Sequence, residues 1–282
     1  DEPAKTMTGN KTDESLYMIE LYKTLKQSLN EIKRYQNLSV VQLKAFKDYM
    51  SVTSKFLPID NENVRRFFKR MNNWLNTKSA PIKTIEIIEK MRVSDGYIPD
   101  TTNWKHCLGS RDYYRGYPCG LWILFHTMTV YEYKNKFKKG NIHMMNNHEV
   151  ILSMRSYIRE FFACKECTDH FTKMSANIEN ELNRPESSVI WLWKSHNNVN
   201  NRLKGVASED PMHPKVEFPT KTMCQECYQW NGEYDEEVVL DFLLEYYSNF
   251  KKNSFINLAI PSQTLISISI IVCITVSGYF SK

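Results

Sequence analysis

Six of the seven cysteines fall into three close pairs, and this pairing is the strongest constraint on how the chain folds. The pairs are Cys107 with Cys119, Cys164 with Cys167, and Cys224 with Cys227. Cysteines this close in sequence form either local disulfides or the ligands of a metal site. The seventh, Cys273, lies in an apolar tail, where a small apolar filler is more typical than a functional thiol. We therefore expect three local disulfides or a metal site.

Apolar residues recur at helical spacing through most of the chain. Between residues 16 and 91 this rhythm predicts about four helices, with boundaries at Pro58 and Pro81, because proline cannot donate the helical hydrogen bond. After an irregular connector at 94–108, the same rhythm predicts five more helices, at residues 121–139, 147–162, 168–182, 187–203 and 236–247. Alternating period-two runs are scarce, so we expect an all-α fold.

Composition narrows the classes of function. The formal charge of +5 is spread over 37 basic and 32 acidic residues without an arginine-rich tract, which argues against nucleic acid as a partner. Glycine is scarce at 9 residues, and neither G-x-G-x-x-G nor G-x-x-x-x-G-K occurs. Because these motifs mark Rossmann and P-loop nucleotide sites, any nucleotide cofactor must be held in another way.

The C-terminal tail indicates a membrane anchor. Residues 265–280 carry no charge, and extending this run back to Pro261 gives about the length needed to cross a bilayer. We expect a membrane span at 262–280, with a buried β-branched strand as the alternative, for which an all-α protein offers no sheet. Glycosylation sequons at Asn10 and Asn37 fit an oxidising lumen. We expect a single-pass protein of the secretory pathway, in the Golgi or endoplasmic reticulum lumen or at the cell surface, with a secreted form as the alternative.

The pair in Cys164-Lys-Glu-Cys167 has the setting of a reactive dithiol. It lies where one helical run gives way to another, and the partial positive charge of a helix N-terminus favours thiolate. A two-residue gap also closes a small ring that is easier to reduce than a structural disulfide. The competing hypothesis joins both C-x-x-C pairs in a four-cysteine zinc site, although they lie far apart in sequence.

Two helix stripes favour a flat cofactor beside this dithiol. Trp122 and His126 are four residues apart and share one helix face. A second stripe combines an aromatic ring, an imidazole and two carboxamides, at Trp193, His196, Asn197 and Asn200. Such stripes offer stacking surface and hydrogen-bond donors, as a heteroaromatic ring requires. Each stripe alone is typical of a core with a polar edge. Together, and with His170 three residues after Cys167, they indicate a flavin pocket.

These residues resemble the quiescin sulfhydryl oxidase family, whose catalytic module belongs to the Erv/ALR class of flavoproteins. The resemblance covers most of the chain. Its most specific motifs are Cys107-Leu-Gly-Ser110, Arg115-Gly-Tyr-Pro-Cys-Gly-Leu-Trp122, the run from Cys164 to His170, Trp191-Leu-Trp-Lys-Ser-His-Asn-Asn-Val-Asn200, Ser208-Glu-Asp-Pro211 and Pro214-Lys-Val-Glu-Phe-Pro219.

The resemblance implies a domain order and a set of FAD contacts. Residues 96–250 would form a helical FAD-binding Erv/ALR domain packed against a degenerate Erv-like domain at 1–95, with 251–282 as linker and transmembrane helix. The FAD contacts would be Arg115, Trp122, His126, Glu166, His170, Trp193, His196, Asn197, Asn200, Lys215 and Phe218. Phe218 departs from the family pattern, since many relatives have Trp at this position.

The resemblance also implies the reaction. A protein dithiol would reduce the disulfide between Cys164 and Cys167, with Cys164 forming the mixed disulfide and Cys167 facing the flavin, and electrons would pass through FAD to O2 to give H2O2. Relatives receive these electrons through a thioredoxin domain that is not visible here. We expect this chain to be a piece of a longer protein, and the alternative is that it oxidises its substrates without that relay. We expect Cys224 and Cys227 to form a stabilising clip and no metal to be bound. The alternative is a membrane-anchored zinc module without enzymatic activity.

Overall fold

Helices dominate the part of the chain that this computed structural model describes, which comprises residues 14–93, 98–99, 103–136 and 148–251. The N-terminal helices are α1 (Met18–Asn30), the short 3-10 helix η1 (Glu31–Arg34), α2 (Val40–Phe56), α3 (Glu62–Asn76) and α4 (Thr84–Val93). The four predicted α-helices are therefore confirmed. Pro58 lies between α2 and α3 and Pro81 just before α4, as expected of boundary residues.

The C-terminal helices largely follow the predicted ranges. They are α5 (Gly116–Lys136), α6 (Glu149–Phe161), α7 (Lys165–Met174), α8 (Ile178–Glu181), α9 (Ser187–Leu203) and α10 (Glu236–Tyr246). The prediction for α9 is confirmed at both ends. The prediction of a single helix at 168–182 is wrong, because α7 and α8 are separate and α7 begins earlier, directly after Cys164.

Local hydrogen bonds explain this difference. Ser175 ends α7, and both its backbone N–H and its hydroxyl donate to the carbonyl of Phe171, at 2.9 and 2.8 Å. A serine that bonds back to the preceding turn competes with continuation of the helix. At the other end the N-cap is Cys164, a residue type outside the usual Ser, Thr, Asp and Asn signals. Apolar periodicity detects neither feature.

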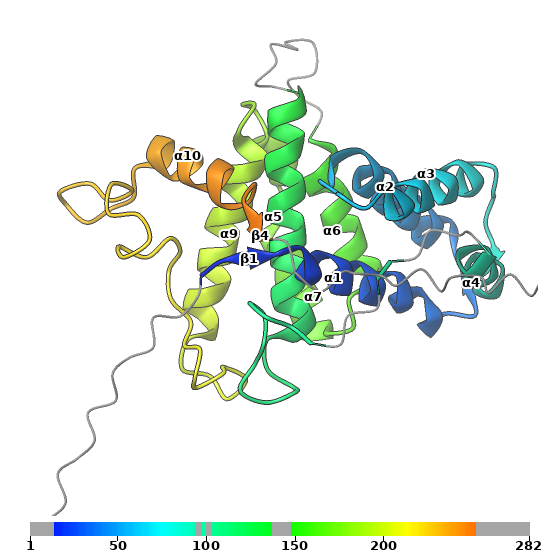
Figure 1. The fold of residues 1–282 in the computed structure, drawn as a ribbon, viewed down its shortest axis with the longest axis horizontal. Helices are drawn as coiled ribbons and strands as arrows, with labels where there is room; N and C mark the ends of the chain where they lie inside the picture. The colour runs from blue at the N-terminus through cyan, green and yellow to red at the C-terminus, as the bar shows by residue number, and fades with distance from the viewer. Residues whose placement is uncertain (1–13, 94–97, 100–102, 137–147, 252–282) are drawn as a thin grey trace, which may run out of the picture. The chain divides into compact units, whose positions relative to one another are not determined.

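Four two-residue strands join distant parts of the chain. β1 (Leu16–Tyr17) pairs in parallel with β4 (Phe250–Lys251), and β2 (Asn37–Leu38) pairs antiparallel with β3 (Ile82–Lys83). The first pair lays the two ends of the described chain side by side (Figure 1). Two residues are too few to show an alternating pattern, so sequence periodicity does not predict these strands.

The N-terminal helices pack directly on the helices that follow them. α1 lies against α5 and α2 against α6, with α9 on another side of α5 (Figure 1). The approach of α1 to α5 requires Gly120, since a Cβ there would lie 2.1 Å from Thr24 Oγ1. Buried residues from both predicted domains contribute to one hydrophobic core. The division of the chain at residues 95 and 96 stays a prediction.

None of the described helices combines the length and the apolar character needed to span a bilayer. The predicted span at 262–280 lies outside the described residues, as do Cys273 and the sequon at Asn10.

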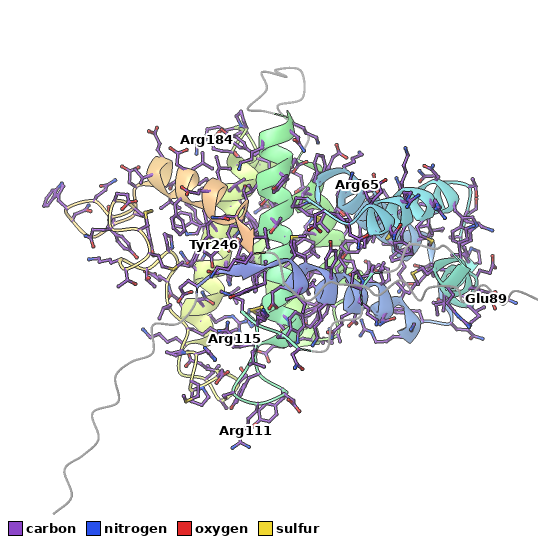
Figure 2. The ribbon with its side chains drawn as sticks, viewed as in Figure 1. Arg65, Glu89, Arg111, Arg115, Arg184 and Tyr246 are labelled. Carbon is purple, nitrogen blue, oxygen red and sulfur yellow. A yellow bond between two sulfur atoms is a disulfide. The ribbon has the colours of Figure 1, made fainter. Side chains whose placement is uncertain are left out.

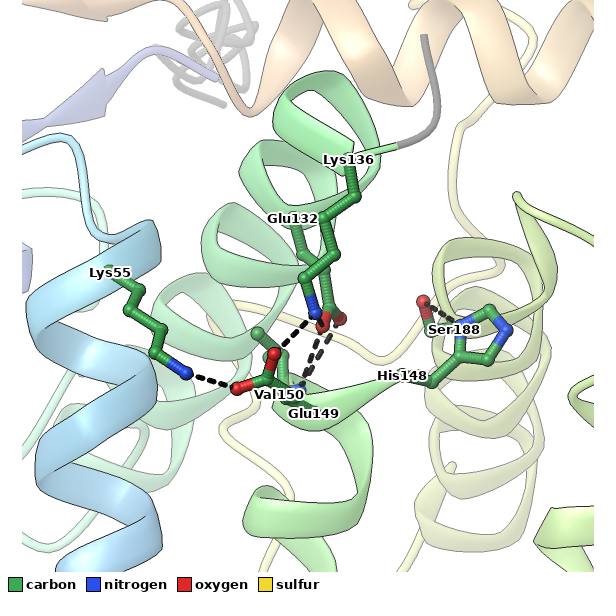
Figure 3. A network of polar contacts seen from close by, with 7 residues as sticks. All are labelled: Lys55, Glu132, Lys136, His148, Glu149, Val150 and Ser188. Atoms are coloured by element: carbon green, nitrogen blue, oxygen red, sulfur yellow. Dashed lines mark hydrogen bonds and ion pairs between the residues drawn. The ribbon is translucent and has the colours of Figure 1, made fainter. Parts of the chain in front are cut away.

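An ionic network, buried at its Glu132–Lys136 end, ties α2, α5 and α6 together (Figure 3). Lys136 forms ion pairs with Glu132 at 3.1 Å and with Glu149 at 2.6 Å, and Lys55 pairs with Glu149 at 2.5 Å. The carboxylate of Glu132 also accepts the backbone N–H of Val150 at 3.3 Å, in the first turn of α6. Glu132 is 0% exposed, and burial raises its pKa to about 7 despite the nearby Lys136 cation. Its charge therefore depends on the ammonium group beside it.

Lys136→Met should lower the free energy of unfolding by about 3–5 kcal/mol, because removing one partner of a buried ion pair leaves the other charge uncompensated. Urea unfolding at pH 8 would measure the loss. The double variant Glu132→Gln with Lys136→Met should recover much of it. Lys44→Met is the control, since its ion pair with Asp48 is exposed and should be worth about 0–1 kcal/mol. Equal losses in the two single variants would contradict this interpretation.

Candidate active site

The Cys164–Cys167 disulfide lies at the N-terminus of α7. Cys164 is the N-cap residue, its Sγ accepts the backbone N–H of Cys167 at 3.3 Å, and the two Cα atoms are 5.3 Å apart. Both cysteines are partly exposed. A helix N-terminus carries partial positive charge and stabilises a thiolate formed there. The arrangement therefore suits a disulfide that exchanges with incoming thiols.

The Cys224–Cys227 disulfide has a different environment. These two cysteines are 1% and 0% exposed. Their burial prevents attack by an external thiolate and supports a stabilising role, because exchange requires access to a sulfur. The remaining disulfide joins Cys107 to Cys119 at the start of α5. Among the described residues, no group of three or more His, Cys, Asp or Glu side chains is arranged to hold a metal ion.

Trp122, His126 and His196 lie together where α5 meets α9. The Trp122 and His196 rings are stacked, with centroids 4.1 Å apart and an interplanar angle of 2°. The Nε2 atom of His126 lies 3.2 Å from Nδ1 of His196, within hydrogen-bonding distance. On another side, the His126 ring stacks on Tyr247 with centroids 4.6 Å apart. The fold thus brings His196 of the second stripe against both residues of the first.

Burial keeps the imidazoles of this cluster neutral. Burial, with a smaller effect of Lys215, lowers the pKa of His196 to about 3. Burial and the neighbouring His196 lower the pKa of His126 well below its ordinary value. The Nδ1 atom of His126 is buried and makes no hydrogen bond within the described structure. A buried polar atom of this kind normally has a partner.

The other residues of the α9 stripe hold the chain segment at 216–218. Asn197 donates its side-chain amide to the Phe218 carbonyl at 2.8 Å and accepts the Phe218 N–H at 2.9 Å. The Trp193 indole also donates to the Phe218 carbonyl, at 2.5 Å, and Asn200 donates to the Val216 carbonyl at 3.0 Å. These side chains, expected to contact FAD, therefore shape the site by fixing this segment against α9.

Two cations lie beside this segment. Arg115 has a positive φ of 58° at the base of α5 and donates to the His106 carbonyl at 2.6 Å (Figure 2). Its Nε atom is buried without a hydrogen-bond partner in the described structure. Burial, followed by the Arg115 charge, lowers the pKa of Lys215. Two neighbouring cations, one with an unused donor, form a suitable site for an anion such as a pyrophosphate.

These features fit the FAD that the sequence predicts. The stacked rings offer a surface for a flat heterocycle, the unpartnered His126 Nδ1 offers a polar contact, and Arg115 with Lys215 offers positive charge for phosphates. A ligand with both aromatic and pyrophosphate parts would satisfy all three.

Glu166 and His170 lie on the exposed side of α7. Glu166 Oε1 is 3.9 Å from His170 Nε2 and 3.7 Å from Arg202 Nη1 in the last turn of α9. This ion pair links Arg202 of α9, the helix that carries His196, to Glu166 of α7. Sequence reasoning missed Arg202 and Tyr247, because a basic residue near a helix end and a core aromatic are common in any helical protein.

Lowered histidine pKa values predict that acid destabilises the folded chain. Below pH 6.5 the unfolded chain gains protons on its histidines while His196 of the folded chain does not, so stability falls as the pH decreases toward 3. His196→Gln should reduce the slope of unfolding free energy against pH by up to about 1.4 kcal/mol per unit. Urea unfolding between pH 5 and 8 measures the slope, and the pH 8 value gives the cost of the substitution itself. Equal slopes would contradict the prediction.

Comparisons with known proteins identify the fold. The model described as FAD-dependent sulfhydryl oxidase matches residues 12–110, and the Erv1 / Alr family model matches residues 119–219. Sulfhydryl oxidase 1 of Cavia porcellus is 35% identical over 255 residues, which cover 88% of this chain and 41% of that protein. Sulfhydryl oxidase 2 of Homo sapiens is 34% identical over 260 residues, which cover 88% and 37%. The chain thus spans less than half the length of these relatives.

A solved structure covers the same region. The sulfhydryl oxidase fragment of human QSOX1 is 32% identical and superposes with a TM-score of 0.77, over 85% of this chain and 99% of that chain. Similarity of this extent, in both sequence and structure, covers the N-terminal helices as well as the disulfide-bearing ones. The chain belongs to the FAD-dependent sulfhydryl oxidase family, with the Erv/ALR-type helical fold.

Proposed function

We propose that this chain is an FAD-dependent thiol oxidase that forms disulfide bonds in protein substrates and passes the electrons to O2, producing H2O2. The observation that carries the proposal is the partly exposed disulfide at the N-terminus of α7, in a chain of this family. FAD, when bound, supplies the two-electron redox chemistry that links a dithiol to dioxygen. The remaining chemistry belongs to the cysteines and to the residues that hold the cofactor.

The first half of the reaction is thiol–disulfide exchange. A substrate thiolate would attack Cys164 Sγ, forming a mixed disulfide and releasing Cys167 as a thiolate in the first turn of α7. A second substrate thiolate would then attack the substrate sulfur of the mixed disulfide and release Cys164. The substrate loses two electrons and two protons, and the enzyme disulfide becomes a dithiol. In the second step the Cys167 N–H, 3.3 Å from Cys164 Sγ, would stabilise the thiolate that Cys164 becomes.

The proposed cofactor contacts follow from the same geometry. Trp122 and His196 would hold the flat rings, His126 would make a polar contact, and Arg115 with Lys215 would bind the phosphates. Asn197, Asn200, Trp193 and the backbone of Phe218 would form the wall of the pocket. Glu166 and His170 would orient the cofactor from α7. Cys167, which the resemblance assigns to the flavin side, would deliver the electrons.

Cys167→Ser should abolish oxygen consumption with dithiothreitol while leaving bound FAD and its visible absorbance in place, because the serine cannot form the disulfide. An oxygen electrode and an absorption spectrum measure both properties. The matched control is the double variant Cys224→Ser with Cys227→Ser, which removes the buried disulfide and should retain turnover at reduced stability. Near-normal activity of Cys167→Ser would contradict the mechanism. Colourless, zinc-bearing wild-type protein would instead support the metal-binding alternative.

We also propose a secretory, membrane-anchored location, with reduced proteins of an oxidising lumen as substrates. The uncharged run at 262–280 and the exposed sequon residue Asn37 support it. Expressed in a eukaryotic cell, the full chain behind a secretory leader should stay in membranes after alkaline carbonate washing, and a chain ending at residue 251 should be released. Endoglycosidase should increase the gel mobility of both. Release of both chains by carbonate would contradict the anchor, and unchanged mobility would contradict glycosylation.

A further inference from the structure

The turn that carries the redox disulfide is short. α6 ends at Phe161, and only Phe162 and Ala163 separate it from Cys164, the N-cap of α7. The position of Cys164 therefore depends on the last turn of α6. Carbonyl groups in the last turn of a helix lack partners within the helix and are free to bind other groups. The groups that bind these carbonyls therefore help to position the disulfide.

Two residues of the N-terminal half bind these carbonyls. The Tyr35 hydroxyl donates to the Glu160 carbonyl at 2.6 Å, and the Arg34 guanidinium donates to the Phe161 carbonyl. The same Nη2 atom of Arg34 also forms an ion pair with Glu31 at 2.9 Å. A cation at a helix C-terminus also interacts favourably with the helix dipole. The end of α6 thus has a charged partner and a neutral one, adjacent in sequence.

The side chain of Phe161 is held by the same half of the molecule. Its ring is 0% exposed and meets the rings of Tyr35 and Phe46 edge to face, with centroids 6.0 and 6.1 Å away. From the other side, the Thr168 hydroxyl of α7 lies 3.4 Å from the Phe162 carbonyl as a donor. The residues just before Cys164 are therefore fixed through backbone and side chain together.

We propose that Arg34 and Tyr35 are positioning residues for the Cys164–Cys167 disulfide, holding the end of α6 so that the two sulfurs stay close when the pair is reduced. Sulfurs held close have a high effective concentration relative to each other, which favours the disulfide and speeds its re-formation. Loss of the two contacts would let the turn move and make the disulfide easier to reduce. This inference rests on the proposed thiol oxidase function.

The test is the redox equilibrium of the Cys164–Cys167 pair in the full chain, measured anaerobically against glutathione by thiol trapping and mass spectrometry of its peptide. The double variant Arg34→Met with Tyr35→Phe should lower the equilibrium constant for disulfide formation about tenfold, which corresponds to a rise of about 30 mV in reduction potential. Turnover with dithiothreitol should fall while FAD content stays the same. Arg34→Lys, which keeps the cation, should restore part of the potential.

Lys33→Met is the matched control, because Lys33 is an exposed cation in the same 3-10 helix, and it should leave the potential unchanged. Tyr35→Phe alone removes one hydroxyl and keeps the partly buried ring, so it should shift the potential less than the double variant and in the same direction, and it can be measured even where the double variant does not fold. A wild-type potential in both Tyr35→Phe and the double variant would overturn the inference. Because the redox equilibrium is measured in the absence of oxygen, it does not depend on turnover. Wild-type protein that shows no turnover would contradict the proposed function, and the reduction potentials of the variants could still be compared with that of the wild type.

Discussion

The packing of Tyr49 against Tyr157 is the contact on which the rest of the structure depends. Their ring centroids are 4.4 Å apart, where α2 meets α6. The Tyr157 hydroxyl donates to the Ser28 carbonyl of α1 at 3.0 Å and lies 2.9 Å from the Tyr117 hydroxyl of α5. Because buried hydroxyls are costly without partners, this network favours one arrangement of four helices over alternative packings. It joins the N-terminal half to the half that carries the disulfides.

The same interface supports both ends of the candidate site. Near the cofactor residues, the buried Glu20 of α1 accepts the backbone N–H groups of Lys105 and His106, at 2.6 and 2.9 Å. The His106 carbonyl in turn accepts a hydrogen bond from Arg115. Near the redox residues, the end of α6 receives donors from Arg34 and Tyr35. The N-terminal helices, which hold none of the reactive cysteines, therefore take part in positioning groups on both sides of the site.

Much of the helical framework follows from the sequence, because apolar spacing reports which face of a helix is buried. Ser187–Leu203 illustrates this success, since its apolar and polar stripes are both clear. Apolar spacing does not predict the two-residue strands or the end of α7 at Ser175, because these features depend on hydrogen bonds rather than on periodic burial. Tyr247 and Arg202 gain their importance only from the neighbours that folding brings to them.

By itself, the sequence determined the three local cysteine pairs, the helical class and the two stripes that meet at the candidate flavin pocket, because each depends on residues near one another in the chain. Only the tertiary structure decided which pair of cysteines is accessible, since Cys224 and Cys227 are buried in the fold while Cys164 and Cys167 are partly exposed. It also decided that Asn197 bonds the Phe218 backbone, and that Arg34 reaches the carbonyl of Phe161. Long-range hydrogen bonds of this kind leave no periodic signal, because each needs only one donor and one acceptor that folding brings together.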